Sequence, residues 1–141
     1  MTPSTIVRRA ALTSLVAILP MGMVLATPNG TPNTLYTVKD PGCGCCDTWA
    51  ELAVEAGFEV EVVESDDMAA VKWEAGVPEV LWSCHTARIG DYVVEGHVPF
   101  AAIRQMLEQS PDINGIAVPG MPAGSPGMGG GVDATVKVTA W

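Results

Sequence analysis

Three cysteines occupy four positions of the stretch "DPGCGCCDTW", which runs from Asp40 to Trp49. Cys43 and Cys46 alone form a C-x-x-C pair, the spacing of a dithiol that exchanges with disulfides. Cys45 is a third thiol that such a switch does not need, because an attacking and a resolving cysteine suffice. A soft metal ion, in contrast, gains from each additional sulfur ligand. The spacing therefore favours a metal site and leaves a dithiol switch as the alternative.

The fourth cysteine and both histidines lie in one segment, "SCHTARIGDYVVEGHVP", as Cys84, His85 and His97. Adjacent residues of a regular strand point to opposite faces, so Cys84 and His85 reach one site only if the backbone leaves strand geometry there. Thiolate and neutral imidazole bind both copper and zinc. We expect Cys84 and His97 to join the cysteine loop as ligands, with His85 ranked after them.

Met121 and Met128 stand in the Gly- and Pro-rich stretch "PGMPAGSPGM". Thioethers are soft ligands that favour Cu(I). Long loops in compact domains tend to be functional or disordered, so both methionines are candidate copper ligands, with plain loop packing as the alternative.

The eight candidate ligands favour copper over zinc. Zinc sites usually use two separated ligand pairs, whereas here three cysteines crowd one turn and methionines accompany them. One Cu(I) ion takes about two to four such ligands, so either some candidates do not bind or more than one copper ion is held. The complete set is Cys43, Cys45, Cys46, Cys84, His85, His97, Met121 and Met128.

The first 26 residues are typical of a cleaved export signal. Arg8 and Arg9 precede an apolar run over 10–25, which ends in small residues at Ala26. The run is shorter than the ~20 apolar residues that span a membrane, so we expect a mature protein that is not membrane-embedded. Export to an oxidising compartment also favours disulfides, and two structural disulfides would make the chain a stapled interaction module. The expected divisions are a signal peptide 1–26, a linker 27–33 and one domain 34–141.

The charge balance excludes one class of partner. Seven Lys and Arg residues stand against sixteen Asp and Glu residues, and the net charge is −9. Nucleic-acid binding needs a basic surface, so we expect no nucleic-acid partner. An acidic surface suits a soluble protein that attracts cations.

Hydrophobic patterning predicts the element order β-α-β-α-β-β-α. Strands are expected over 34–39, 58–64, 83–89 and 92–96. Helices are expected to start at Cys46, at Ser65-Asp66 and at Pro99. A long Gly/Pro-rich loop over 109–132 follows, and the alternation of "DATVKVTAW" predicts an extra C-terminal edge strand. This order, with C-x-x-C at the first βα junction, is typical of a thioredoxin-like α/β fold.

Four motifs resemble a family of exported, thioredoxin-like metal-binding proteins that includes the periplasmic copper-resistance protein CopG. They are "CGCC", "GVPEVLWSCHTA", "YVVEGHVP" and "GIAVPGMPAGSPGM", and they span 35–128. The resemblance implies copper binding in the periplasm, alongside other copper-resistance proteins. Its metal-binding motifs correspond to the same eight residues, without deciding which of Cys84, His85 and His97 bind the metal. It also implies a multi-copper cluster that changes the oxidation state of copper.

The sequence thus predicts a periplasmic protein for copper resistance that either sequesters Cu(I) or cycles it with Cu(II). Whether that cycling makes it an enzyme, a copper oxidoreductase, stays open. The two alternatives are a periplasmic thiol–disulfide oxidoreductase that uses Cys43 and Cys46, and a disulfide-stapled interaction module.

Overall fold

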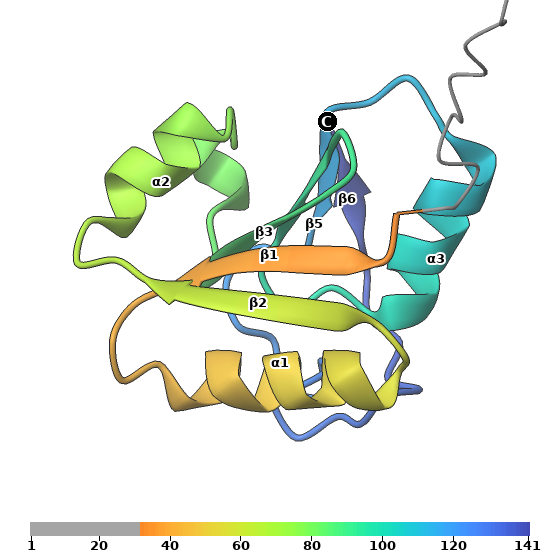
Figure 1. Ribbon diagram of the computed structural model, residues 1–141, viewed down its shortest axis with the longest axis horizontal. Coiled ribbons are helices and arrows are strands. Elements are labelled where there is room, and N and C mark those ends of the chain that lie inside the picture. The colour runs from red at the N-terminus through yellow and green to blue at the C-terminus, as the bar shows by residue number, and fades with distance from the viewer. Residues whose placement is uncertain (1–31) are drawn as a thin grey trace, which may run out of the picture.

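The computed structural model describes residues 32–141, which form a mixed α/β fold around one six-stranded sheet (Figure 1). The strand order across the sheet is β2-β1-β3-β4-β5-β6. The strands are β1 Thr34–Lys39, β2 Glu59–Glu64, β3 His85–Ile89, β4 Tyr92–Glu95, β5 Gly115–Ala117 and β6 Thr139–Ala140. The expected signal peptide, and most of the expected linker, lie outside the described residues.

Three α-helices and one short 3-10 helix cover the sheet. They are α1 Gly44–Glu55, α2 Met68–Glu74, η1 Glu79–Leu81 and α3 Phe100–Gln109. The apolar faces of α1 and α3 meet one face of the sheet in a core that contains Trp49, Ile89, Val94, Phe100 and Ile103. Lys72 of α2 reaches Thr86 and Glu95 on the opposite face, so the helices lie on both sides of the sheet.

The pairing of the strands carries three segments to one end of the sheet. β1 runs parallel to β2 and antiparallel to β3, and Lys39 at its end pairs with His85. A tight turn at Gly90, with φ +56°, returns the chain from β3 into β4. The end of β1, the start of β3 and the end of β4 therefore meet beside the first turn of α1.

The expected elements are present, with three corrections. The segment taken as loop over 109–132 contains β5, which extends the sheet because its backbone pairs in parallel with β4. The C-terminal edge strand is only Thr139–Ala140, paired with β5. The first helix begins at Gly44 rather than Cys46, so all three cysteines stand at or just before its first turn.

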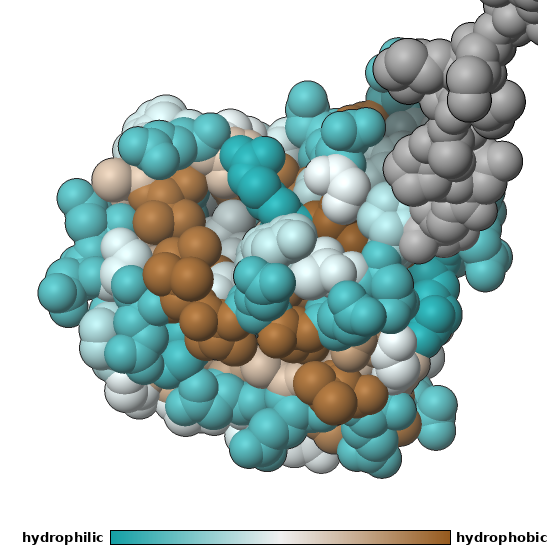
Figure 2. Space-filling model, in the orientation of Figure 1, coloured by the Kyte–Doolittle hydropathy of each residue, from teal (hydrophilic) through white to brown (hydrophobic). Residues whose placement is uncertain are grey.

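β2 is more exposed than its alternating sequence suggests. It is the edge strand next to β1, and five of its six residues are exposed, including Val62 and Val63. Figure 2 shows an irregular apolar stripe among hydrophilic side chains on the face where β2 and α2 lie toward the viewer. An edge strand lacks a neighbour on one side, so alternation there does not lead to burial. Its glutamates discourage pairing with another chain.

Within residues 32–141, no helix is both long and apolar enough to cross a membrane.

Candidate metal centre

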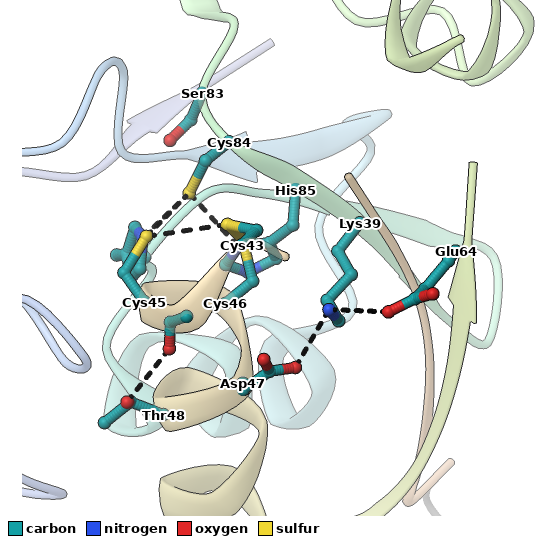
Figure 3. The surroundings of a disulfide bond; sticks show 12 residues. Lys39, Cys43, Cys45, Cys46, Asp47, Thr48, Glu64, Ser83, Cys84 and His85 are labelled. Atoms are coloured by element: carbon teal, nitrogen blue, oxygen red, sulfur yellow. Dashed lines mark hydrogen bonds and ion pairs between the residues drawn. A yellow bond between two sulfur atoms is a disulfide. The ribbon is translucent and has the colours of Figure 1, made fainter. Parts of the chain in front are cut away.

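The cysteine loop connects β1 to α1 and places its sulfur atoms at the helix N-terminus. Cys43 is the residue that precedes the helix, and its carbonyl accepts from the amides of Cys46 and Asp47. Free N–H groups and the helix dipole stabilise thiolate at this position. In the structure Cys43 and Cys46 are joined by a disulfide, while Cys45 and Cys84 are free (Figure 3). This oxidised form leaves two of the four cysteines available as thiols.

Cys84 lies opposite the cysteine loop, just before the first residue of β3. Its Sγ is 3.9 Å from Cys45 Sγ, which in turn is 3.6 Å from Cys43 Sγ. Because β3 begins only at His85, Cys84 is not bound by strand alternation, and its Sγ lies 3.6 Å from His85 Nδ1. The backbone thus leaves strand geometry at Cys84, which is the condition under which the side chains of Cys84 and His85 can face one site.

His97 has the hydrogen-bonding pattern of a metal ligand. It is fully buried, and its Nδ1 lies 2.7 Å from the carbonyl oxygen of Pro126. A carbonyl only accepts, so Nδ1 carries the proton and donates it. Nε2 is then the acceptor, and it lies 2.8 Å from Cys84 Sγ. Metal-binding histidines commonly donate their second ring N–H to such a carbonyl, which fixes the ring.

His85 is also fully buried, and its Nε2 has no hydrogen-bond partner. Its ring packs on Trp49, with 4.5 Å between centroids, and meets His97 edge-on at 5.1 Å. Burial lowers the pKa of His85 well below its ordinary value, with smaller effects from His97 and Lys72. Burial also lowers the pKa of His97. Both imidazoles are thus neutral at pH 7, the form that binds metal.

The Gly/Pro-rich loop packs over this site. Besides the His97–Pro126 bond, the backbone at Gly127 is so close to α1 that a Cβ there would lie 2.7 Å from the carbonyl oxygen of Cys45. Met128 follows directly and is partly buried, whereas the side chain of Met121 is 55% exposed. The loop therefore carries Met128 next to a residue that touches the site and leaves Met121 facing solvent.

One buried lysine, Lys39, lies beside the cysteine loop and pairs with two carboxylates (Figure 3). Lys39 Nζ lies 3.0 Å from carboxylate oxygens of both Glu64 and Asp47, and these hydrogen bonds raise its pKa. The contact with Asp47 ties the first turn of α1 to the end of β1.

Burial, followed by the nearby Cys45, raises the pKa of the Cys84 thiol to about 12. Cys84 thus stays protonated near neutral pH until a metal displaces its proton.

Two groups of side chains could each hold a metal ion. One consists of the four cysteines and the other of Cys84, His85 and His97, with ligand atoms in each group within 4.8 Å of one another. Cys84 belongs to both. Six of the eight sequence-predicted residues are thus brought together.

Sequence reasoning missed the polar groups that hold the ligands in place. The carbonyl of Pro126 gives no side-chain signal, so its bond to His97 is invisible in the sequence. Glu95 lies beside the cluster, fully buried and hydrogen-bonded to the amide of Ser83. An acidic residue at the end of the apolar run "YVV" was the one available hint.

Two solved structures resemble the chain closely. The first, described as copper resistance protein CopG form 1, is 42% identical with a TM-score of 0.70, and the match covers 77% of this chain and 87% of that one. The second, form 2 of the same protein, has the same identity and TM-score and is covered to 88%. The chain belongs to the CopG family.

A model of the family described as "Protein of unknown function, DUF411" matches residues 81–128. This range contains the Cys84, His85 and His97 group of the CopG-like chain, together with both loop methionines. A search of curated proteins found no match.

We expect Gly127→Ala to loosen the loop over the site. The added methyl group would meet the Cys45 carbonyl at 2.7 Å in a residue with φ +80°. Gly129→Ala is the matched control, because its φ is +90° but no atom lies within 4 Å of the new Cβ. Urea unfolding of the metal-free protein should show a loss of about 1–2 kcal/mol for the control, from left-handed backbone strain. Gly127→Ala should lose about 1–3 kcal/mol more. Equal losses would contradict the contact.

Cys84 should resist alkylation in the folded, metal-free, oxidised protein. With a pKa of about 12 against an ordinary 9.0, its reaction with iodoacetamide should keep accelerating up to about pH 12. The protonated thiol also contributes to the free energy of unfolding. This contribution is fully present below pH 9 and is lost as the pH rises from 9 towards 12. Peptide mass spectrometry gives the rate for Cys84, with the urea-unfolded chain as control. A Cys84 rate that levels off near pH 9 in the folded protein would refute this environment.

Proposed function

We propose that the protein binds Cu(I) as cargo at the paired Cys and His groups and serves copper resistance in the periplasm. The observation that carries the proposal is the donor set: four sulfur atoms and two neutral imidazoles converge at one end of the sheet. Soft sulfur and imidazole donors suit Cu(I). Carboxylates, which suit hard cations, are absent from both described ligand groups. The name of the 42%-identical structures, copper resistance protein, supports the same metal.

The arrangement favours more than one copper ion. Cys84 is the residue common to the two ligand groups, and a thiolate sulfur has enough lone pairs to bridge two metal ions. In this proposal Cys43, Cys45 and Cys46 complete one side of the cluster, and His97 with His85 the other. Met128 and Met121 are additional candidate ligands from the loop.

The finer structural and cellular assignments belong to the same proposal. The fold is thioredoxin-like, with the C-x-x-C pair at the junction of β1 and α1. Residues 1–26 are a cleaved signal peptide, so the mature domain acts in the periplasm with other copper-resistance proteins as partners. Zinc is the less favoured metal.

The disulfide supports a redox role at the same site. When the Cys43 and Cys46 thiols become the disulfide, they release two electrons and two protons. Two Cu(II) ions accept these electrons and become two Cu(I) ions. Cys45 and Cys84 stay free in this oxidised form and are available to hold the product. The protein would thus reduce Cu(II) to Cu(I) as an oxidoreductase, with an external reductant that returns the disulfide to the dithiol. A full copper cycle would also need a separate oxidant that accepts one electron from each Cu(I).

The two alternatives differ in what the cysteines do. A disulfide-stapled module requires all four cysteines to be oxidised, whereas Cys45 and Cys84 are free in this structure. A thiol–disulfide oxidoreductase uses the observed Cys43–Cys46 pair but gives Cys45 no role.

The first test is copper stoichiometry in the reduced mature chain. After anaerobic Cu(I) loading and desalting, elemental analysis should find more than one copper per chain, retained against excess zinc. Cys84→Ser should lose more copper than Cys45→Ser, because only Cys84 belongs to both groups. Met106→Leu, a change in the α3 core, is the control and should bind as the unaltered chain does. The opposite outcome has two parts: the unaltered chain retains no copper, and the Cys43–Cys46 couple still works normally in Cys45→Ser. The protein would then be a dithiol oxidoreductase instead.

The redox step predicts a fixed ratio of products. Anaerobic addition of Cu(II) to the reduced, metal-free protein should yield two Cu(I) for each Cys43–Cys46 disulfide, measured with a colorimetric Cu(I) chelator and by disulfide mapping. Cys45→Ser should keep this ratio, since the pair is intact. Cys46→Ser removes one partner and should abolish the internal disulfide and slow Cu(I) formation. An undiminished rate in Cys46→Ser would exclude the pair as the electron source.

A further inference from the structure

A buried ion pair lies beside the ligand groups without belonging to either. Glu95 at the end of β4 is fully buried, and Lys72 of α2 is 3% exposed. Lys72 Nζ lies 2.7 Å from Glu95 Oε1. Thr86 of β3 completes the network: its hydroxyl donates to Glu95 Oε2 at 2.7 Å and accepts from Lys72 at 3.0 Å. Apolar residues of similar size usually give equal or greater stability than a buried ion pair, so stability alone does not account for this one.

The carboxylate of Glu95 also holds the segment that carries Cys84. Its Oε1 accepts the backbone N–H of Ser83 at 2.6 Å. Ser83 precedes the first residue of β3, so the ladders between β3 and its neighbouring strands do not reach this amide. Charge-assisted hydrogen bonds are shorter and stronger than neutral ones, which suits an anchor for one peptide. Glu95 thus anchors the amide directly before Cys84, while Ser83 also forms an isolated β-bridge with Gly120 and its hydroxyl donates to the Gly120 carbonyl.

The same residue stands two positions before His97. Between them, the amide of Gly96 donates to the carbonyl of His85 at 2.9 Å. A side chain on Gly96 would collide with Ser83, so the two segments 83–85 and 95–97 are closely packed. The contact of 2.8 Å between Cys84 Sγ and His97 Nε2 lies across these two segments. Any shift of Ser83 away from Glu95 moves Cys84 relative to His97.

We propose that Glu95 is the positioning residue of the metal centre: its carboxylate fixes the Ser83 amide, and through it the separation of Cys84 and His97, while Lys72 neutralises its charge. The role rests on the proposed function, because it concerns how well a preformed pair of ligand atoms receives copper. Glu95 contacts no metal ligand atom itself. Loss of an outer residue that orients a ligand typically weakens metal binding about 10–100-fold, which is the size of effect expected here.

Two double variants separate the hydrogen bond from the ion pair. In Lys72→Met/Glu95→Gln, the amide oxygen still accepts from Ser83. In Lys72→Met/Glu95→Met, the charge balance is the same and the volume similar, but no acceptor remains. Both should fold, because apolar replacement of a buried pair is tolerated. Thr86→Val is the control, since it removes two network hydrogen bonds, those to Glu95 and from Lys72, without removing the bond to Ser83.

Cu(I) affinity is measured anaerobically by competition with a chromogenic chelator, and folding by thermal unfolding. The Gln double variant and Thr86→Val should bind Cu(I) within about threefold of the unaltered chain. The Met double variant should bind about 10–100-fold more weakly at similar stability. Equal affinity of the two double variants, whether both retained or both lost, would overturn the proposal. If the Met variant does not fold, Glu95→Asp, which withdraws the carboxylate by one methylene, must show the loss instead.

A second readout does not need copper. Nitrogen-15 NMR of the metal-free protein reports the protonation of each His97 ring nitrogen and its contact with Cys84. Only the Met double variant should shift the Nε2 signal, and an unchanged signal would count against positioning by Glu95. If the unaltered chain binds no copper, the proposed function fails, while this measurement still decides the role of Glu95.

Discussion

The contact between Cys84 Sγ and His97 Nε2 is the constraint on which the candidate centre depends. Its two atoms come from the start of β3 and from just beyond the end of β4, and the hairpin register, with Thr86 opposite Glu95, brings them together. A slip of one residue would turn every side chain of one strand to the other face. The register that buries Ala87 and Val94 in the core is therefore the register that forms the site.

Polar groups inside the domain are concentrated at this end of the sheet. Lys39, Lys72, His85, Glu95 and His97 are all buried there, and each except His85 has a hydrogen-bond or ion-pair partner for its polar atoms. Burying such groups costs free energy unless they are paired, so the surrounding hydrogen bonds define the position of each one closely. His85 Nε2 is the exception among these five groups, and a further hydrogen-bond partner or a bound ion would satisfy it. Of the two buried side-chain polar atoms without a hydrogen-bond partner within residues 32–141, one thus belongs to a predicted ligand, and the other is the Thr37 hydroxyl.

The proposed copper binding and the oxidation of the cysteines involve the same sulfur atoms. With Cys43 and Cys46 joined, the site offers two thiols, and with them reduced it offers four. In the proposed function, the number of copper ions held would therefore depend on the redox state of the Cys43–Cys46 pair. Cys45 contacts Cys43 on one side and Cys84 on the other. Because it is outside the disulfide, its thiol is available whether the Cys43–Cys46 pair is oxidised or reduced.

Local patterns in the sequence predicted much of the fold. The bounds of β1 and the buried face of α3 follow from residue alternation and helical spacing, because short-range periodicity reports which side of an element is buried. The exposure of β2 did not follow, since alternation cannot say whether a strand is central or at an edge. β5 was missed because three residues among glycines and prolines carry too weak a pattern.

By itself, the sequence determined the chemistry: the types and spacing of four cysteines and two histidines specify a soft metal site or a dithiol. Only the tertiary structure decided which of these atoms meet. It brought His85 and Cys84 to one side by starting β3 at His85, two residues later than expected, and it joined His97 to Cys84 across a hairpin. It also recruited Glu95 and the Pro126 carbonyl as supports. Such contacts depend on strand register and loop packing, which arise between segments distant in the chain and leave no local pattern.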